Sequence, residues 1–314
     1  MMKSARSPVA VWRGRDLFDG RVAESTTVIL RTRGCRWNRC VMCGYAQEGV
    51  DASAEDIIAQ FRSILDKVEG AELVKIYTSG SFLDPAEVPE AARLEILRSL
   101  RDMDVRRLVI ESRPEYIDRL ALEQILSFLD AEIGIGLESS SDLVRTYLIN
   151  KGFTFFDFTG ASDMIHSLGG RVKTYLLLKP PGLSEMEAIA DAMRSARDAE
   201  PYSDIISLNL CNVQRNTPLE RMWQRGGYRP PWLWSAVEVL REASLKIPVI
   251  CDPVGAGARR GPHNCGTCDG YVAAAIRSFS LSQSRADLNV DCSCRSVWRK
   301  VLELEDLSFG VPLV

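Results

Sequence analysis

The sequence lacks several features that would place it in a special class of protein. No apolar run reaches the ~20 residues that a membrane-spanning helix needs. Residues 1–20 mix Arg, Asp and Trp and do not form the apolar core of a signal peptide. There is no low-complexity segment and no short internal repeat. We therefore expect a globular, cytoplasmic protein that does not bind a membrane.

An excess of positive charge is absent too. The 314 residues carry a formal net charge of −3. Proteins that bind nucleic acid unaided are usually basic, because neutralising phosphates supplies much of the affinity. The overall charge therefore gives no support to a nucleic-acid substrate, although a local basic patch or a partner could supply the contacts.

Short apolar, β-branched runs alternate with longer stretches of helical periodicity. Repeated βα units with short connections imply a parallel sheet with right-handed crossovers. Six such units predict a partial (β/α)6 barrel, and an open doubly wound sheet is the alternative. We expect strands at 26–31, 73–78, 107–111, 132–137, 172–178 and 205–210, helices at 54–68, 89–102, 114–129 and 184–199, and helical segments up to Leu168.

The regular pattern ends near Cys211. Beyond it we expect helices at 217–225 and 232–245, a strand at 247–251 and a loop rich in Gly and Arg at 255–261. The predicted organisation is an N-terminal extension at 1–24, a barrel at 25–210 and a small C-terminal cysteine-rich region at 211–314.

Seven of the nine cysteines lie in two tight groups, which in a reducing compartment indicates metal sites. The first group, Cys35, Cys40 and Cys43, begins where the first predicted strand ends. Three thiolates can hold a 4Fe–4S cubane and leave one iron open for the amino and carboxylate groups of S-adenosylmethionine (SAM), and no fourth cysteine lies nearby. The same C-x4-C-x2-C spacing also suits a zinc knuckle with a distant ligand or a plant-type ferredoxin site.

The second group pairs Cys265 and Cys268, at zinc-knuckle spacing, with Cys292 and Cys294. A structural tetrahedral zinc ion is the expected occupant, with His263 able to replace Cys292 or Cys294. An auxiliary iron–sulfur cluster and reduced, unliganded thiols are the alternatives.

Two further features of the C-terminal region have open roles. The cationic loop that contains Arg259, Arg260 and His263 fits either phosphate contact or a solvated turn. An aromatic stretch is expected to pack in the core, with base stacking as the alternative; it consists of Trp223, Tyr228, Trp232 and Trp234.

The first cysteine segment resembles the radical SAM superfamily, whose commonest spacing, C-x3-C-x2-C, is one residue shorter in the first gap. After the second strand, Thr78-Ser79-Gly80-Ser81-Phe82 resembles the glycine-rich turn of this superfamily, which contacts the SAM amino group through its backbone. After the third and fourth strands, Glu111-Ser112-Arg113-Pro114-Glu115 and Gly136-Leu137-Glu138-Ser139 resemble elements of the Elp3-like branch. The resemblance implies a 4Fe–4S cluster on the three cysteines, with Glu111 or Glu138 on the ribose or amino group of SAM. It implies SAM contacts from Met42, Tyr45, Ser79, Gly80, Ser81, Glu111, Arg113, Glu138 and Ser139.

The order of motifs over nearly the whole chain, ending in Gly-Pro-His-Asn-Cys-Gly-x-Cys, resembles the archaeosine-synthesis branch of radical SAM proteins (RaSEA). This resemblance implies a lyase of archaeal tRNA modification. Its substrate is a D-loop 7-cyano-7-deazaguanine that a partner lysine transferase, ArcS, has joined to lysine. Cleavage of the lysine-side C–N bond leaves archaeosine, and SAM is consumed as an oxidant with help from an external electron donor.

The expected substrate contacts come from Lys179, Asn209 and Arg215, with Lys179 or Arg215 on the lysine carboxylate. Two other functions stay open. One is a different Elp3-like tRNA-modifying radical enzyme. The other is a non-catalytic, zinc-stabilised tRNA-binding subunit, which predicts no SAM cleavage and no iron.

Overall fold

The computed structural model describes residues 4–243, 245–308 and 311–313. The chain forms two compact units, each assembled from separate segments. Unit 1 consists of Met1–Asn38, Tyr45–Gly136 and Phe156–Lys173, and unit 2 of Arg39–Gly44, Leu137–Phe155 and Thr174–Val314. The first cysteine loop is thus divided, with Cys35 in unit 1 and Cys40 and Cys43 in unit 2.

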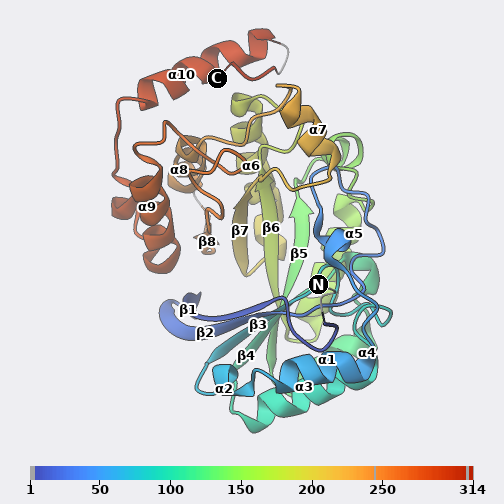
Figure 1. The fold of residues 1–314 in the computed structure, drawn as a ribbon. Coiled ribbons are helices and arrows are strands. Elements are labelled where there is room, and N and C mark those ends of the chain that lie inside the picture. The colour runs from blue at the N-terminus through green and yellow to red at the C-terminus, as the bar shows by residue number, and fades with distance from the viewer. Residues whose placement is uncertain (1–3, 244, 309–310, 314) are drawn as a thin grey trace. The chain divides into compact units, whose positions relative to one another are not determined.

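The described residues contain an eight-stranded sheet whose strand order follows the sequence from β1 to β8 (Figure 1). β2 to β5 pair in parallel, as do β7 and β8. A doubly wound sheet would reverse its strand order part-way, so the uninterrupted order confirms the partial barrel class. The strands are β1 (Ala10–Phe18), β2 (Arg21–Ile29), β3 (Leu73–Tyr77), β4 (Arg107–Glu111), β5 (Asp130–Glu138), β6 (Arg171–Leu178), β7 (Ile205–Leu210) and β8 (Val249–Ile250).

β1 was not expected, because its residues fall within the predicted N-terminal extension. It pairs antiparallel with β2, and Phe18 lies opposite Arg21, so only Asp19 and Gly20 make the turn. Both turn residues have positive φ, 48° and 77°. An Asp-Gly pair is a strong sequence signal for this two-residue hairpin turn. The Asp19-Gly20 dipeptide therefore predicts the β1–β2 hairpin, and the sequence analysis overlooked it.

In unit 1 the helices are shorter than expected, because local breaks divide two of them. The predicted helix at 54–68 ends at Arg62 and resumes at Leu65. Its start is fixed by a capping box in which Ser53 and Asp56 bond each other's backbone N–H. The elements are η1 (Tyr45–Glu48), α1 (Ala54–Arg62), α2 (Leu65–Val68), α3 (Glu90–Asp102), η2 (Pro114–Tyr116), α4 (Arg119–Leu126) and, from its second residue, α5 (Phe155–Ser167).

Unit 2 holds the remaining helices. Ser184 and Glu187 form a second capping box at the start of α6. α9 and α10, near the second cysteine group, were not expected. The elements are the π-helix η3 (Val144–Ile149), α6 (Glu185–Ala199), η4 (Glu200–Tyr202), α7 (Pro218–Gln224), α8 (Leu233–Glu242), α9 (Asp269–Ser282), η5 (Arg285–Leu288), α10 (Arg295–Leu304) and η6 (Glu305–Ser308).

Among the described residues, no helix has both the length and the apolar character that crossing a membrane requires.

Candidate functional site

The unit 1 part of the cysteine loop packs directly on the glycine-rich turn after β3. A Cβ added to Gly80 would lie 2.6 Å from the Cα of Cys35 and 2.3 Å from Oε2 of Glu87. Only glycine permits this approach of two backbones. The turn is therefore built to lie against the first cysteine.

Glu87 stabilises the contact between the glycine-rich turn and Cys35. Its Oε2 accepts the Ser81 N–H at 2.5 Å, and its Oε1 accepts the Thr32 hydroxyl at 2.7 Å. Burial raises the pKa of the Glu87 carboxyl, against the opposing effect of these hydrogen bonds. Thr32 precedes the cysteine loop and Ser81 belongs to the turn, so one buried side chain fixes both. Sequence reasoning missed Glu87, which carries no motif signal.

We expect Gly80→Ala to disrupt this contact. The added methyl meets Cys35 backbone, which cannot rotate away, so the protein is destabilised by about 3 kcal/mol. A loop displaced by ~1 Å lowers the rate of SAM cleavage by about 100-fold. Iron content after anaerobic reconstitution and the rate of 5′-deoxyadenosine formation measure the effect.

Gly160→Ala is the matched control, because a Cβ at this position of α5 meets nothing within 4 Å. It should leave iron binding intact and raise helix stability by up to ~1 kcal/mol. Equal behaviour of the two variants would contradict the proposed contact.

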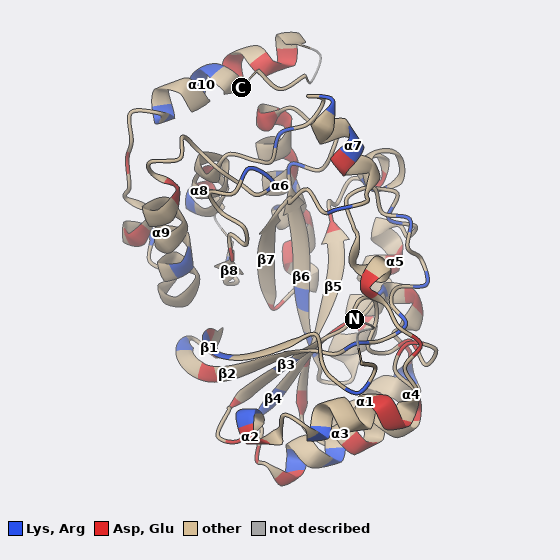
Figure 2. Cartoon of the chain, in the orientation of Figure 1, with Lys and Arg blue, Asp and Glu red and all other residues tan. Residues whose placement is uncertain are grey.

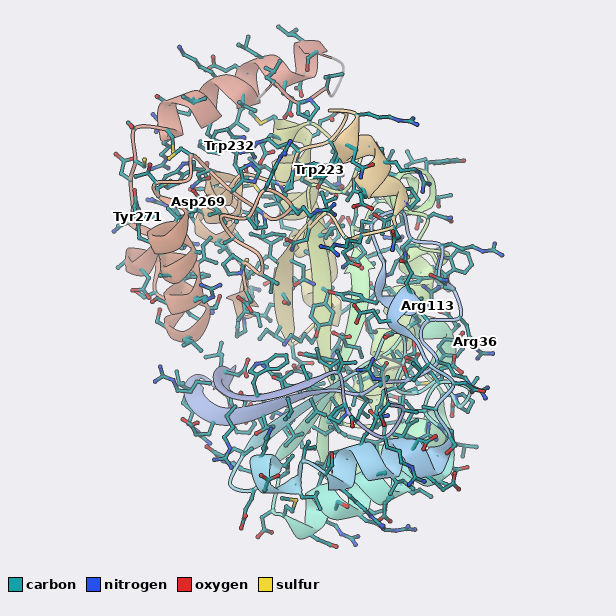
Figure 3. All side chains as sticks on the ribbon, viewed as in Figure 1. Arg36, Arg113, Trp223, Trp232, Asp269 and Tyr271 are labelled. Atoms are coloured by element: carbon teal, nitrogen blue, oxygen red, sulfur yellow. The ribbon has the colours of Figure 1, made fainter. Side chains whose placement is uncertain are left out.

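Arginines anchor the residues that follow Cys35. Arg36 makes two bonds to Asp84, of 2.6 and 2.8 Å, and lies over the Tyr116 ring. Arg113 lies over the Trp37 ring, with 5.2 Å between its guanidinium carbon and the ring centroid (Figure 3). These contacts orient the loop between the first two cysteines.

The predicted SAM ligands of unit 1 lie in different settings. The Arg113 guanidinium bonds Glu115 at 2.5 Å, while its backbone N–H donates to Ser81 Oγ at 3.1 Å. Glu111 ends β4, half-buried, and its carbonyl accepts the Phe82 N–H at 2.8 Å. The backbone of the third motif thereby supports the glycine-rich turn. Tyr45, which starts η1, is 56% exposed.

In unit 2 the Cys40–Cys43 turn is tied to two other segments. The Cys43 N–H bonds the Cys40 carbonyl at 3.2 Å. Val41 bonds Ile149 and Leu219 through backbone atoms, at 2.8 and 3.1 Å. Met42 is 9% exposed and packs in an apolar cluster. The side chain of Met42 thus has a packing role, which leaves its backbone for a cofactor.

Glu138 and Ser139, at the end of β5, are held by different partners. Glu138 has a positive φ of 69°, a strained conformation that concentrates at functional sites. Its carboxylate lies 2.7 Å from the Lys151 ammonium. Ser139 is fully buried and donates to Asp191 at 3.0 Å. Glu138 is therefore the better placed of the two to meet a ligand.

Two of the predicted substrate residues lie at or beyond the end of β7. Asn209 is half-buried and accepts a bond from Ser207 at 3.4 Å. Arg215 is exposed, and a Cβ added to Gly44 would lie 3.1 Å from the Arg215 carbonyl oxygen. Gln214 Oε1 accepts the Gly44 N–H at 2.5 Å. Arg215 is therefore next to the Cys40–Cys43 turn.

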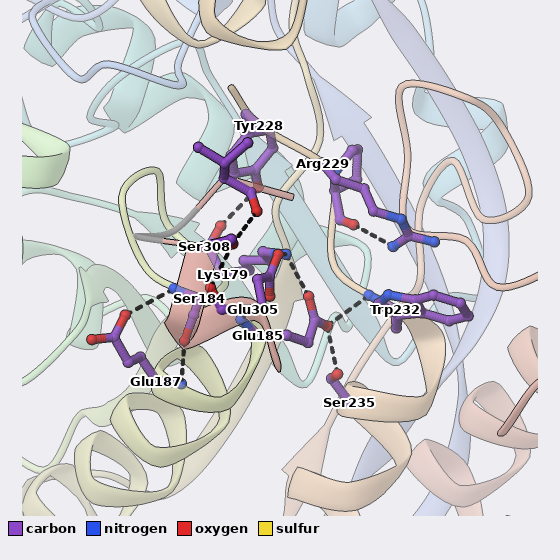
Figure 4. A network of polar contacts seen from close by, with 12 residues as sticks. Lys179, Ser184, Glu185, Glu187, Tyr228, Arg229, Trp232, Ser235, Glu305 and Ser308 are labelled. Atoms are coloured by element: carbon purple, nitrogen blue, oxygen red, sulfur yellow. Dashed lines mark hydrogen bonds and ion pairs between the residues drawn. The ribbon is translucent and has the colours of Figure 1, made fainter. Parts of the chain in front are cut away.

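Lys179, the third predicted substrate residue, is 2% exposed and lies in a buried ionic network (Figure 4). Its ammonium is 2.6 Å from Glu185 and 3.3 Å from Glu305. Glu185 also accepts bonds from the Ser235 hydroxyl and the Trp232 N–H, at 2.5 and 2.8 Å. This pairing favours a structural role for Lys179 over contact with a substrate.

Replacing Lys179 by methionine should destabilise the protein by about 3–5 kcal/mol, because two buried carboxylates lose their counter-ion. Denaturation by urea measures the change. Lys179→Met combined with Glu305→Gln should recover part of the loss, and Lys300→Met on the exposed face of α10 should change little. A loss below 1 kcal/mol in the single variant would contradict the buried ion pair.

The second cysteine group converges in unit 2. The four Sγ atoms of Cys265, Cys268, Cys292 and Cys294 lie within 4.8 Å of one another. Cys265 Sγ is 3.7 Å from that of Cys268 and 3.9 Å from that of Cys292, and the Sγ atoms of Cys268 and Cys294 are 3.6 Å apart. His263 stands outside this set, with Nδ1 2.7 Å from the Gly261 carbonyl oxygen. The structure therefore brings together the four cysteines without the histidine.

N–H groups contact three of these thiols and favour their charged form, but burial outweighs this effect at Cys268 and Cys294 and raises the pKa of both. The backbone N–H of Cys268 lowers the pKa of Cys265 to about 6. Asn264 and the Trp234 indole direct N–H groups at Cys268 and Cys294, at 3.3 and 3.2 Å. Trp234 was expected in the core, where it lies, but its contact with a cysteine was missed.

Asp269 holds the cysteine turn from the start of α9. Its carboxylate accepts the Asn264 and Gly266 N–H groups, each at 2.6 Å. One sequence pattern indicates this role, a carboxylate directly after a Cys-Gly-x-Cys knuckle.

No family model matches the chain. The chain is 47% identical over 322 aligned residues to archaeosine synthase subunit beta of Methanosarcina acetivorans, covering 98% of this chain and 93% of that protein. It is 42% identical to the protein of the same name from Thermococcus kodakarensis, covering 93% and 96%. The chain belongs to the archaeosine synthase subunit beta family.

Solved structures support the fold of this family member. Methylornithine synthase matches 92% of the chain and 83% of its own, with a TM-score of 0.56 and 17% identity. Queuine lyase from Clostridium spiroforme, solved with SAM and queuine, matches 66% of the chain and 82% of its own, with a TM-score of 0.51 and 20% identity. Both matches agree with the predicted partial barrel fold.

Proposed function

We propose that this protein is the radical SAM lyase of archaeosine formation in tRNA. It cleaves the lysine C–N bond of a lysine-modified 7-cyano-7-deazaguanine in the D-loop. The observation that carries the proposal is the near full-length relationship to archaeosine synthase subunit beta, combined with a three-cysteine loop after β2. The family name, a subunit of a synthase, also supports a partner protein.

The proposed cofactors are a 4Fe–4S cluster on Cys35, Cys40 and Cys43 and a SAM molecule on the iron without a cysteine. The close packing of Gly80 on Cys35 supports a SAM site here, because backbone groups of the glycine-rich turn then lie next to the first cluster ligand. When bound and reduced, the cluster supplies the electron that splits SAM into methionine and a 5′-deoxyadenosyl radical.

The chain's own residues bind and orient SAM. Ser79, Gly80 and Ser81 offer backbone groups to its amino end, and Met42 and Tyr45 contribute from the cysteine loop. Glu111 and Glu138 are the carboxylates for the ribose and amino groups. Arg113 and Ser139 support the SAM site indirectly. The backbone N–H of Arg113 donates to Ser81, and Ser139 is buried.

Substrate binding is assigned to Arg215 and Asn209. Arg215 has a solvent-exposed guanidinium, which suits the carboxylate of the lysine moiety. Lys179 directly follows β6, and its ion pairs with Glu185 and Glu305 hold that end of the strand in place. In the proposed domain organisation, the barrel at 25–210 carries out catalysis and the region 211–314 holds the second cysteine group.

The proposed partners are tRNA, the lysine transferase ArcS and an external electron donor, all in the cytoplasm. The transferase supplies the lysine-modified base, and the electron donor reduces the cluster. A chain with a net charge of −3 gains from a partner that helps to hold tRNA.

We propose zinc for the second site, on Cys265, Cys268, Cys292 and Cys294. Ligands ~2.3 Å from one ion at tetrahedral angles stand about 3.8 Å apart, and the three measured Sγ–Sγ distances are 3.6–3.9 Å. Thiolates of an iron–sulfur cluster bind different irons and stand further apart. The spacing therefore supports a single ion over an auxiliary cluster.

The reaction is tested by mass spectrometry of nucleosides from lysine-modified tRNA incubated with reconstituted protein, SAM and reductant. Conversion of the modified nucleoside to archaeosine supports the proposal. SAM cleavage without archaeosine would favour another Elp3-like tRNA reaction, and a protein with zinc but no iron would favour the non-catalytic subunit.

A further inference from the structure

An arginine cluster lies on unit 2 where the loop at 255–261 meets α7 (Figure 2). Arg260 is its anchor. The Arg260 carbonyl accepts the Val213 N–H at 2.8 Å, and its guanidinium pairs with Glu220. The same guanidinium lies 4.8 Å from the Trp223 ring centroid. Arg260 is thus fixed by these three contacts and serves to shape the surface.

Arg259 differs from its neighbour. It is exposed, and its guanidinium carbon lies 5.2 Å from the Trp223 ring centroid. Stacking on an aromatic ring orders a guanidinium through its face and leaves its N–H edge for a planar or tetrahedral anion. An ordered but solvent-facing arginine is suited to phosphate.

Arg215 adds a third positive charge near Glu220. Hydrogen bonding by Arg260 lowers the pKa of Glu220 most, and the charge of Arg215 contributes to the same shift. The guanidinium groups of Arg260 and Arg215 thus act on one carboxylate, and Arg259 adds its own positive charge beside Trp223. This surface is therefore positive, although the whole chain carries −3.

The cluster also adjoins the turn that carries two of the three cysteines. Gln214 bonds the Gly44 N–H, and the Arg215 carbonyl lies against Gly44, the residue directly after Cys43. Because Val213 also bonds the Arg260 carbonyl, a phosphate held at Arg259 lies close to the turn that carries Cys40 and Cys43.

We infer that Arg259 and Arg260, organised around Trp223, form the surface that binds the phosphodiester backbone of the RNA substrate, next to Arg215 and the turn that carries Cys40 and Cys43. The inference rests on the proposed function, which makes the substrate an RNA. Backbone phosphate contacts set the register of an RNA on a protein, and reading of the modified base is left to the strand ends.

The test is equilibrium binding of tRNA to the reconstituted protein at several salt concentrations, without reductant. Arg259→Ala should weaken binding several-fold and reduce the slope of log affinity against log salt by about 1. Arg259→Lys, which keeps the charge but loses the planar edge, should lie between. Iron and zinc contents check that the variants fold.

Arg299→Ala on α10 is the control, because it removes one exposed arginine outside the pair that contacts Trp223. It should leave affinity and salt slope unchanged. If Arg259→Ala binds tRNA as the unaltered protein does, while the unaltered protein forms archaeosine, the inference fails and the proposed function stands. If the salt slope falls as expected but the unaltered protein forms no archaeosine, the surface stands and the proposed function fails.

Discussion

Replacing Cys40 by alanine is expected to abolish SAM cleavage, with 5′-deoxyadenosine reduced to the background of a reaction without protein. Two remaining thiolates hold a four-iron cluster poorly, because cluster iron is kept by cysteine ligation. The Cys40–Cys43 turn itself should survive, since its bonds to Ile149 and Leu219 come from the backbone of Val41. Iron content, visible absorbance and 5′-deoxyadenosine yield are the measurements.

Cys251→Ala is the matched control. Cys251 is buried, 2% exposed, and lies outside both cysteine groups. Removing one buried sulfur should lower stability modestly and leave iron content and SAM cleavage in place. If Cys40→Ala kept its full iron content and its activity, the assignment of the cluster would be wrong.

The second large effect is expected at the other cysteine group. Cys268→Ala should remove the ion and unfold the segment that it ties together, since binding of a structural zinc contributes on the order of 10 kcal/mol. Cys268 is fully buried at the start of α9, and Cys294 is next to the start of α10. Loss of the ion therefore releases both helices.

Elemental analysis, limited proteolysis and thermal unfolding measure this effect. The unaltered protein should contain one zinc per chain in addition to the iron of a single 4Fe–4S cluster. Cys268→Ala should contain no zinc and be cleaved by protease between α8 and α10. Additional iron and sulfide in place of zinc would show an auxiliary cluster and refute the argument from Sγ spacing.

Strand positions could be predicted where burial is complete. The bounds of β4 and β7 match the expected 107–111 and 205–210, because short runs of Ile, Leu and Val between polar residues leave little freedom. α9 and α10 were not predicted. The apolar residues of α10 recur at helical spacing on one face, so its sequence did carry the signal, whereas the pattern of α9 is weaker. The start of each helix follows a cysteine of the second group, so the convergence of the four thiols positions both.

In the candidate site too, local features could be predicted from the sequence and contacts between distant residues could not. Cysteine spacing and the strand-end motifs are local patterns, so the sequence alone predicts roles for Cys35, Gly80 and Glu138. Of the two carboxylates beside Lys179, Glu185 is close in the sequence, but Glu305 lies 126 residues away. A lysine at a strand end therefore suggested a ligand contact, whereas the fold supplies it with buried carboxylates.

The central claim is tested most directly by 5′-deoxyadenosine formation. The protein is purified without oxygen, reconstituted with iron and sulfide, reduced, and given SAM with lysine-modified tRNA, with unmodified tRNA or with none. The account predicts that the lysine-modified tRNA stimulates cleavage strongly and yields archaeosine. No cleavage of SAM by protein that holds a complete cluster would contradict it.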